Sequence, residues 1–240
     1  MTVSARLTHQ GGGDGPNLVL IHGYGADGLS WTPMIGGLSQ NFRVWTVDLP
    51  GHGQAGADVG DGTLEVLAAA VQNVIADLDG AMHVIGHSLG GAVAARLSGV
   101  DLMTLIAPTG MGSGPDPAFL DGLTDAEDIA SVHAILQRLV LRKALIQQPM
   151  AAHAASSLGR PMRREALQKI SIEIKRREPT HVNDAKVQVV WGADDAINPL
   201  DDATRSRLGD RLHIVENTCH LPQVEATSKV IKLIKSHHLV

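Results

Sequence analysis

Aromatic residues are scarce in this chain: its 240 residues include three Trp, two Phe and one Tyr. Proteins that bind single-stranded nucleic acid stack bases on aromatic side chains, so this composition argues against such a surface. A basic face is not indicated either, because 20 Lys and Arg residues stand against 25 Asp and Glu, for a net charge of −5. We therefore do not expect nucleic acid as a partner.

Long apolar runs and metal-binding motifs are also absent from the sequence. No run approaches the ~20 apolar residues that span a bilayer, so we expect no membrane-spanning helix. The zinc spacings CxxC and HExxH do not occur, although there are twelve histidines, and we expect neither a metal nor another cofactor. The single cysteine, Cys219, excludes an internal disulfide framework and fits a reducing compartment. Because the N-terminus has no apolar signal segment, we expect a cytoplasmic protein.

Short apolar runs alternate with amphipathic stretches along the chain. The runs are rich in β-branched residues, continuous, and bounded by Gly, Pro, Asp or Asn, which is typical of buried strands. These predicted strands cover residues 17–23, 42–48, 82–88, 102–108, 187–194 and 212–217. Helical spacing of apolar residues occurs at 63–79, 88–98 and 223–236. Strand–helix alternation predicts an α/β fold, with a mostly parallel sheet and helices on both of its faces.

The stretch from about Met111 to Val182 breaks this alternation, because it carries several helical patterns and no convincing strand. Ligands of open α/β sheets bind at the carboxyl ends of strands, where such an insertion would form a roof. We therefore predict an α/β core of residues 1–110 and 186–240 and a helical cap of residues 111–185. Apolar residues recur in it at helical intervals, and some of them should face Ser88 and line an acyl pocket suited to aliphatic groups. The recurring residues are Phe119, Leu120, Ile135, Leu136, Leu139, Leu145 and Met150.

Residues 86–90, GHSLG, place a serine between two glycines, at the end of a predicted strand and the start of a predicted helix. This is the sequence context of a nucleophile elbow, in which a strained turn exposes the serine hydroxyl. The alternative is a tight strand-to-helix turn with an incidental serine. Side chains at Gly86 or Gly90 would strike the neighbouring strand or helix. Ser88 is the candidate nucleophile.

A serine hydroxyl needs a base that takes its proton and an acid that orients the base. Asp194 and Asp195 end the apolar run that begins at residue 187, and His220 lies in a loop after the last predicted strand. Taken separately, these residues could be a solvated loop histidine and aspartates that cap a turn. Nucleophile, acid and base nevertheless occur in the order expected for this architecture. The sequence thus predicts a Ser-His-Asp triad, with the choice between the two aspartates open.

Acyl transfer also needs hydrogen-bond donors for the oxyanion that forms at the attacked carbonyl. One candidate is the backbone N–H of Leu89, at the positive N-terminus of the helix after Ser88. The other is the backbone N–H of Tyr24, in the glycine-rich loop after the first strong strand. His22 in that loop and His87 beside the serine are predicted to be structural.

Together these segments resemble the α/β-hydrolase family. The likeness runs from about residue 17 to the C-terminus and rests on HGYG (22–25), VDLPGHG (47–53), GHSLGG (86–91), WGADDAINP (191–199) and CHLPQVE (219–225). The resemblance implies the α/β-hydrolase fold, with Ser88 and His220 in the catalytic triad. The family pattern W-G-x-x-D has its acid three residues after the glycine, which selects Asp195 over Asp194. The family ending H-x-P-x-x-E puts Glu225 at a helix start.

A narrower likeness covers residues 105–127, LIAPTGMGSGPDPAFLDGLTDAE, and the helices after them. This part resembles the hydrolase-like domain of the acyltransferase component in acetoin dehydrogenase complexes. Such proteins usually carry a lipoyl domain before this one. Because only about sixteen residues precede the first strong strand, we expect this chain to be without that domain.

The resemblance implies a cofactor-free serine hydrolase that cleaves carboxylic esters or thioesters through an acyl-enzyme. Its partner would be a small-molecule acyl substrate. Three alternatives use the same scaffold. They are an acyltransferase, in which a thiol or alcohol replaces water, a hydrolase of C–C bonds next to a carbonyl, and a non-catalytic binding domain of a dehydrogenase complex. The complete triad argues against the last of these.

Overall fold

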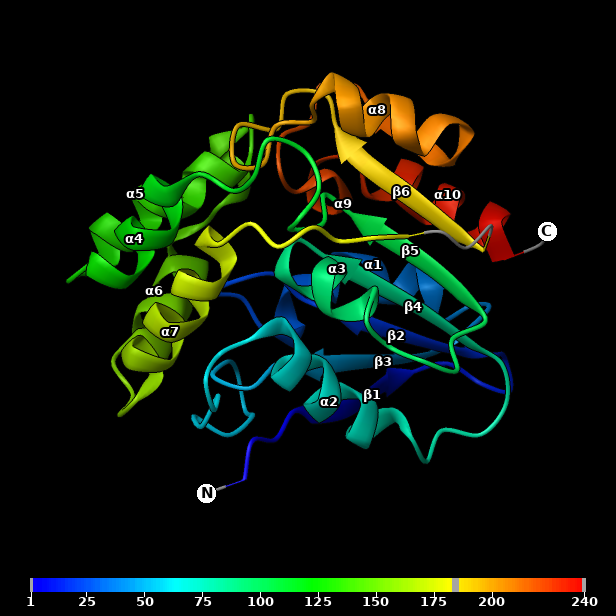
Figure 1. Cartoon of the computed structure of the whole chain (residues 1–240), viewed down its shortest axis with the longest axis horizontal. Coiled ribbons are helices and arrows are strands. Elements are labelled where there is room, and N and C mark those ends of the chain that lie inside the picture. The colour runs from blue at the N-terminus through cyan, green and yellow to red at the C-terminus, as the bar shows by residue number, and fades with distance from the viewer. Residues whose placement is uncertain (1, 183–185, 239–240) are drawn as a thin grey trace.

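The computed structural model describes residues 2–182 and 186–238, and a seven-stranded sheet of order β1-β3-β2-β4-β5-β6-β7 forms its centre (Figure 1). The strands are β1 (Arg6–Gly11), β2 (Asn17–Ile21), β3 (Arg43–Asp48), β4 (Met82–His87), β5 (Leu102–Ile106), β6 (Val187–Gly192) and β7 (Leu212–Val215). Strands β2 to β7 pair in parallel, and β1 pairs antiparallel with β3. The predicted fold, a mostly parallel sheet built from the six predicted strands, is confirmed.

Strand β1 was not predicted from the sequence. It lies at the edge of the sheet, and its residues, RLTHQG, are exposed or half-buried. An edge strand without a fully buried face carries no continuous apolar run, so the pattern that identified the other strands is missing here.

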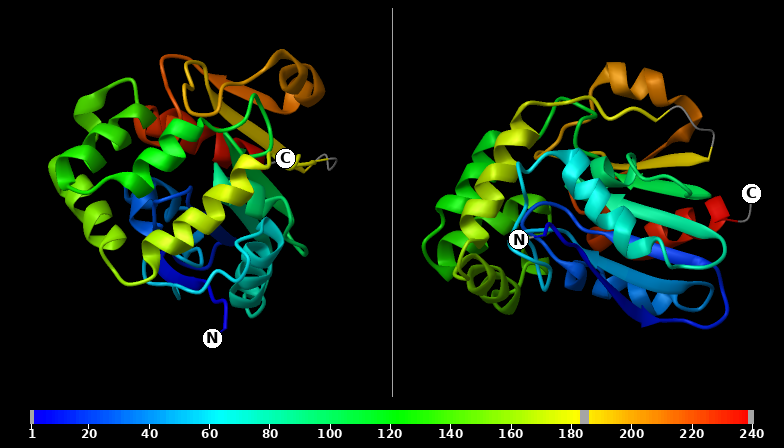
Figure 2. Two further views of the ribbon diagram at one scale, coloured as in Figure 1. Left: turned by 60° about the vertical axis from the view of Figure 1, so that its left-hand side comes forward. Right: turned by 60° about the horizontal axis from the view of Figure 1, so that its bottom comes forward.

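Helices cover both faces of the sheet, as predicted (Figures 1 and 2). On one face α1 (Thr32–Leu38) and α10 (Thr227–His238) pack on Leu18 and Leu20 of β2. On the other face α2 (Leu64–Ile75), α3 (Leu89–Ala94) and α8 (Asp202–Leu208) pack in a cluster with Val19 and Ile21. Successive residues of β2 point to opposite faces, and a fully buried strand therefore needs apolar residues throughout. The described residues outside the segment between β5 and β6 also form the short helices η1 (Gly28–Trp31), η4 (Gly209–Arg211) and α9 (Pro222–Glu225).

The segment between β5 and β6 is helical, and no strand occurs in its described part, residues 107–182. Its helices are α4 (Pro117–Asp125), α5 (Ile129–Leu136), η2 (Gln137–Leu139), η3 (Lys143–Leu145), α6 (Gln148–Leu158) and α7 (Arg163–Lys175). Side chains of Asp116 and Asp128 cap α4 and α5 by accepting backbone N–H bonds. Helices α4 to α7 gather beside the carboxyl ends of the parallel strands (Figures 1 and 2). Residues 183–185, the end of the predicted cap, lie outside the described residues.

Two buried side chains attach α7 to the core. The Arg163 guanidinium donates to the carbonyl oxygens of Gly53 and Ala55, over 3.3 and 2.5 Å. Tyr24 lies in the loop after β2, and its hydroxyl donates to the carbonyl of Leu167 over 3.1 Å. The helical segment is therefore bonded directly to loops at the carboxyl edge of the sheet. None of the helices in the described ranges has the length and apolar character required to cross a membrane.

Candidate active site

Ser88 lies in the turn between β4 and α3, where its backbone takes a left-handed conformation with φ of +52°. A non-glycine residue is strained there, and the bond from its N–H to the Ile106 carbonyl, 2.8 Å long, helps to hold it. A Cβ added at Gly86 would lie 2.3 Å from the Gly90 carbonyl oxygen, and one added at Gly90 would lie 2.3 Å from that of Ile21. The close approach of three backbone segments thus requires both glycines. The turn has the geometry expected of a nucleophile elbow.

His220 and Asp195 form a buried hydrogen bond. The Nδ1 atom of His220 lies 2.7 Å from Oδ2 of Asp195, and the two side chains are almost fully buried. The Oδ1 atom of Asp195 accepts the backbone N–H groups of Ile197 and Asn198, each over 2.9 Å. Asp194, in contrast, is exposed. The structure therefore brings Asp195 rather than Asp194 to the histidine, in agreement with the W-G-x-x-D pattern.

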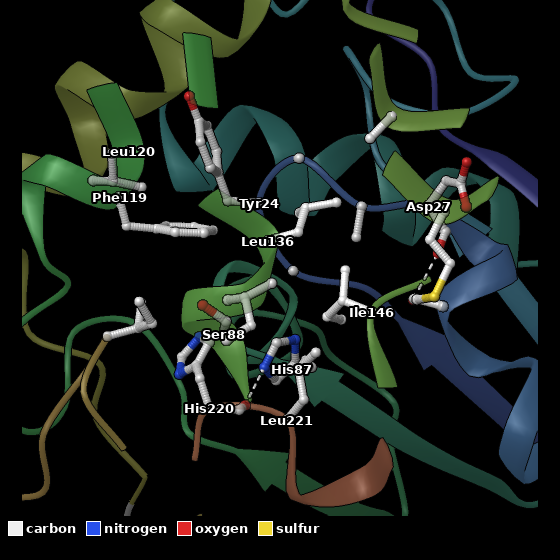
Figure 3. A pocket seen from close by; sticks show the side chains of 18 of the residues that line it. Tyr24, Asp27, His87, Ser88, Phe119, Leu120, Leu136, Ile146, His220 and Leu221 are labelled. Atoms are coloured by element: carbon white, nitrogen blue, oxygen red, sulfur yellow. Dashed lines mark hydrogen bonds between the residues drawn. The ribbon is translucent and has the colours of Figure 1, made fainter. Parts of the chain in front are cut away.

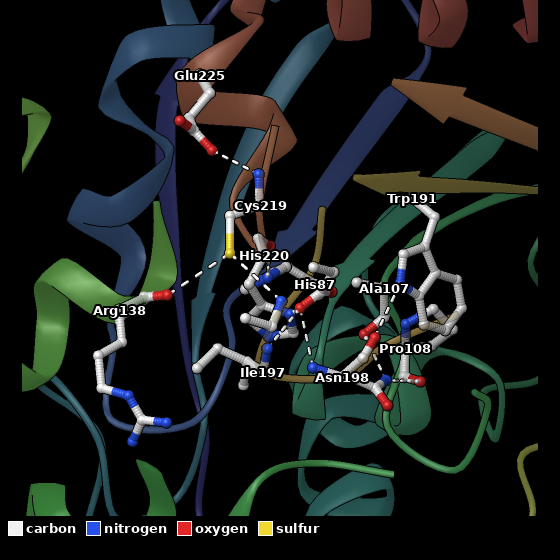
Figure 4. Close-up of polar contacts among 12 residues, drawn as sticks. His87, Ala107, Pro108, Arg138, Trp191, Ile197, Asn198, Cys219, His220 and Glu225 are labelled. Atoms are coloured by element: carbon white, nitrogen blue, oxygen red, sulfur yellow. Dashed lines mark hydrogen bonds and ion pairs between the residues drawn. The ribbon is translucent and has the colours of Figure 1, made fainter. Parts of the chain in front are cut away.

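Asn198 holds the loop that carries Asp195 (Figure 4). Its carbonyl accepts the indole N–H of Trp191 over 3.0 Å, and its side-chain amide donates to the carbonyl of Pro108 over 3.1 Å. Asn198 is buried, so these bonds connect the loop to the end of β6 and to the segment after β5. This residue was not predicted from the sequence. Its place three residues after the predicted acid, within WGADDAINP, is the signal that could have found it.

Ser88 and His220 lie next to each other on the wall of one cavity (Figure 3). Nδ1 of His220 is bonded to Asp195, whereas no residue in the described ranges is a hydrogen-bond partner of Nε2. That nitrogen is therefore available to accept a proton. The structure thus brings together the serine, histidine and aspartate that the sequence singled out.

His87 fixes the backbone of His220. Its Nε2 atom donates to the His220 carbonyl over 2.9 Å, and the two rings lie 4.8 Å apart (Figure 3). Burial, followed by the neighbouring charge of His220, holds the pKa of His87 well below 6.5. The His87 ring is therefore neutral near pH 7 and places no positive charge beside His220.

The backbone N–H groups of Tyr24 and Leu89 are both unpaired within the described part of the chain. Leu89 opens α3 directly after Ser88, and Tyr24 lines the cavity with Ser88. A Cβ added at Gly23 would lie 3.3 Å from the Cβ of Ser88, which shows how closely this loop approaches the serine. Two donors without acceptors near one hydroxyl can stabilise a developing oxyanion.

Two buried histidines hold the loop that contains Tyr24. His22 donates from Nδ1 to the Gly23 carbonyl over 2.8 Å and accepts the Leu49 N–H at Nε2. His52 accepts the Gly25 N–H at Nε2 over 3.1 Å. Burial lowers the pKa of His22, and burial together with the charge of His22 lowers the pKa of His52 to about 3. Both imidazoles are therefore neutral near pH 7, and each can accept one backbone N–H.

The cavity measures about 390 Å³ and is lined mostly by apolar side chains. Of the seven apolar cap residues from which some were expected to line an acyl pocket, five line this cavity, whereas Ile135 and Leu145 do not. The five are Phe119, Leu120, Leu136, Leu139 and Met150. Additional apolar lining comes from Leu29, Ile146, Ile174, Ile197 and Leu221. In the described residues no group of His, Cys, Asp and Glu side chains has the size and arrangement to hold a metal ion.

Because it contains several buried histidines, we expect the protein to lose stability in acid. The pKa values of His22, His52, His83 and His87 are lower in the folded state than the ordinary 6.5, chiefly because of burial. The unfolded chain therefore binds more protons below pH 6.5. Above pH 6.5 we expect the contribution of these histidines to the free energy of unfolding to be constant. It should then fall as the pH drops, by about 1.4 kcal/mol per pH unit for each of His52 and His83, whose pKa is lowered to about 3.

Urea unfolding at pH values from 7.5 to 5.0 measures this dependence. His83 lies away from the cavity and is bonded to the Thr104 hydroxyl, and its pKa is lowered to about 3. His83→Gln removes one titrating group, so the slope below pH 6.5 should decrease by about 1.4 kcal/mol per pH unit. A variant with the wild-type slope would contradict the assignment for His83.

Comparison with known proteins places these features in a family. Residues 18–233 match the family model described as "Alpha/beta hydrolase family". The dihydrolipoyllysine-residue acetyltransferase component of the acetoin cleaving system of Cupriavidus necator is 27% identical over 261 residues, which cover 98% of this chain. The chain spans 66% of that relative's length and 62% of its Pseudomonas putida counterpart. This match confirms the narrower likeness predicted from the sequence.

Two further proteins are similar over nearly their whole lengths. The pimeloyl acyl-carrier-protein methyl ester esterase of Methylococcus capsulatus is 29% identical, over 92% of this chain and 94% of its own. The solved structure of 2-hydroxy-6-oxo-6-phenylhexa-2,4-dienoate hydrolase from Rhodococcus superposes with a TM-score of 0.83 and 21% identity, over 98% of this chain and 95% of its own. The latter likeness shows the fold. Since the family model matches most of its length, the chain belongs to the alpha/beta hydrolase family.

Proposed function

We propose that this chain is a serine hydrolase of carboxylic esters or thioesters. In this proposal Ser88 is the nucleophile, His220 is the general base and acid, and Asp195 orients the histidine. One observation carries the proposal: the buried 2.7 Å bond between Asp195 and His220 lies beside the cavity that also contains the strained Ser88 turn. The similarity to a methyl ester esterase supports it. The chemistry needs protein groups and water alone.

The first half of the proposed reaction forms an acyl-enzyme. Oγ of Ser88 attacks the carbonyl carbon of the substrate while Nε2 of His220 takes the hydroxyl proton. Asp195 accepts the proton on Nδ1 in a hydrogen bond, which selects the tautomer with a basic Nε2 and stabilises the imidazolium. The N–H groups of Tyr24 and Leu89 bind the oxyanion. Collapse of the tetrahedral intermediate breaks the bond to the alcohol or thiol, which leaves with the proton from Nε2.

The second half releases the acid. Water loses a proton to Nε2 of His220 and attacks the acyl carbon, and the same N–H groups bind the second oxyanion. The intermediate then expels Oγ of Ser88, which recovers its proton from His220. A thiol or alcohol in place of this water would give an acyltransferase, with the same residues in the same roles.

The lining of the cavity supports a neutral, aliphatic acyl group. No Lys or Arg contributes to this cavity in the described part of the chain, and Asp27 is its one carboxylate outside the triad. A substrate with its own carboxylate, such as the dienoate named for the similar Rhodococcus hydrolase, would find no Lys or Arg to pair with in the described lining, and the one imidazole there outside the triad and His87, that of His153, is bonded to Asp27. This observation favours ester or thioester cleavage over C–C cleavage. We also propose that residues 111–185 act as the substrate-binding cap of the core formed by 1–110 and 186–240.

Two assays test the proposed function. A fluorophosphonate should label the wild-type protein covalently at Ser88, and peptide mass spectrometry locates the modified residue. A panel of p-nitrophenyl esters and acyl thioesters, from two to twelve carbons, should then reveal turnover. A non-catalytic binding domain would leave Ser88 unlabelled, and that result would overturn the proposal.

Substitutions in the cap should change the preferred acyl length. Leu136 of α5 lines the cavity, and Leu136→Trp fills part of it. We expect the ratio of kcat/KM for an octanoyl ester to that for an acetyl ester to fall about tenfold, because pockets discriminate by this much for small differences in fit. Leu145→Trp is the matched control, since Leu145 belongs to the same helical segment but does not line the cavity. An equal change in both variants would refute the assignment of Leu136.

A further inference from the structure

A short backbone segment of the helical insertion, residues 138–142, lies between the cavity wall and the loops that carry the proposed triad. Leu139 in this segment lines the cavity, and so do Leu136 just before it and Ile146 just after it. An acyl group in the cavity therefore contacts side chains on both sides of residues 138–142. The backbone of residues 138–142 therefore directly connects three residues of the wall.

Glu225 bonds this segment to the His220 loop. Its side chain is fully buried, and Oε1 accepts the backbone N–H groups of Leu141 and Arg142 over 3.0 and 3.1 Å. Oε2 accepts the backbone N–H of Cys219 over 2.7 Å, directly before His220 (Figure 4). The carboxylate was expected only to start a helix. It instead joins two segments more than seventy residues apart, through bonds of the strong, charge-assisted kind.

Cys219 bonds the same segment to the Asp195 loop. Its thiol donates to the carbonyl of Arg138 over 3.6 Å, and its sulfur accepts the backbone N–H of Ala196 over 3.5 Å (Figure 4). Ala196 directly follows Asp195. Burial raises the pKa of the Cys219 thiol, which therefore keeps its proton as a hydrogen-bond donor. Residues 138–142 are thus bonded directly to the base loop and connected through Cys219 to the acid loop.

We propose that Glu225 is a positioning residue that couples the acyl wall of the cavity to His220, so that a long acyl group aligns the base as well as binding to the enzyme. This inference rests on the proposed function and deepens it. The substrates it implies are esters with an acyl chain long enough to contact Leu136, Leu139 and Ile146. The benefit of a long chain should therefore appear in kcat and not only in KM, because alignment of the base lowers the barrier to attack.

Glu225→Gln tests the coupling with little change of shape. A carboxylate can accept all three N–H groups, whereas an amide has one accepting oxygen, and its NH₂ must face either Cys219 or residues 141–142. The bridge is broken on one side. We expect the ratio of kcat for p-nitrophenyl octanoate to kcat for the acetate to exceed one in the wild type. In Glu225→Gln this ratio should fall about tenfold, the effect of one lost charge-assisted hydrogen bond.

Two other variants keep this test decisive. Lys143→Ala is the control, because Lys143 is exposed beside the segment, and its ratio should match the wild type. Cys219→Ala removes the thiol contacts and leaves Glu225 in place, so a smaller fall in the ratio, about threefold, is expected from a neutral hydrogen bond. It serves as the test if Glu225→Gln does not fold. Equal losses for both esters in the folded variant would overturn the coupling.

A measurement without turnover separates this inference from the proposed function. Octanamide is an unreactive neutral analogue of the acyl group, and its binding should shift the NMR signal of the His220 Nδ1 proton in the wild type. Acetamide should not shift it, nor should octanamide in Glu225→Gln at saturating concentration. A shift without ester hydrolysis would refute the hydrolase and leave the coupling intact. The same octanamide shift in Glu225→Gln as in the wild type would refute the coupling.

Discussion

Replacement of Ser88 by alanine is expected to lower kcat for ester hydrolysis by about 10⁶-fold, which is the scale of loss when a triad nucleophile is removed. The hydroxyl is the only group that Ser88→Ala deletes. Alanine fits the same turn, because the φ of +52° is already that of a residue with a Cβ. The hydrogen bond from the residue 88 N–H to the Ile106 carbonyl also remains. The midpoint of thermal unfolding should therefore stay within a few degrees of the wild type.

Steady-state kinetics with a p-nitrophenyl ester and fluorophosphonate labelling together measure this effect. Ser156→Ala is the matched control, because Ser156 is an exposed serine on α6 and is not part of the cavity lining. The control should keep wild-type turnover and labelling. Turnover near the wild-type value in folded Ser88→Ala would show that the reaction uses another nucleophile, and the assignment would fail.

The candidate site was predictable because each of its groups follows a strand in a short local motif. Ser88 follows β4, Asp195 follows β6, and His220 follows β7. The carboxyl ends of parallel strands meet at one edge of the sheet, so order along the chain already places the three loops together. The choice between the two aspartates needed the W-G-x-x-D pattern. The structure supports that choice by the exposure of Asp194 and the bond from His220 to Asp195.

Contacts between distant segments were not predictable in the same way. Glu225 meets residues 141–142, and Asn198 meets Pro108, only because the insertion and the loops fold onto each other. The polarity of each residue was visible in the sequence, but its partners were not, because spacing along the chain sets no distance between separate loops. Strand β1 was missed for a different reason: it lies at the sheet edge, where burial imposes no apolar run.

Only part of the helical segment could be assigned from its pattern. Helical spacing identified apolar faces, yet a face can pack on another helix or on the cavity. Ile135 illustrates the first case, because a Cβ added at Gly122 of α4 would lie 2.7 Å from its Cδ1. Leu136, the next residue, lines the cavity. Adjacent residues of one helix therefore have different roles, and only the packing of α4 against α5 distinguishes them.

Replacement of Asp195 by asparagine is expected to lower kcat by about 10⁴-fold, which is the effect of this change in Ser-His-Asp triads. In the wild type, Oδ1 of Asp195 accepts the N–H groups of Ile197 and Asn198. The asparagine oxygen can accept the same two groups, so the fold should survive. The amide nitrogen then replaces Oδ2 opposite His220 and donates to Nδ1. The ring is left with its proton on Nε2, in the tautomer that cannot accept a proton from Ser88.

Asp194→Asn makes the same chemical change one residue away and is the matched control. Its side chain is exposed, and among the described residues its one hydrogen bond runs from its backbone N–H to the Thr218 carbonyl. Exposed substitutions of this kind have small effects, so kcat should stay within about twofold of the wild type. The pH profile gives a second readout. Loss of the orienting carboxylate should make kcat of Asp195→Asn rise with pH into the alkaline range, where hydroxide can replace the missing base. A crippled Asp194→Asn beside a nearly normal Asp195→Asn would reverse the two assignments, despite the 2.7 Å bond to His220.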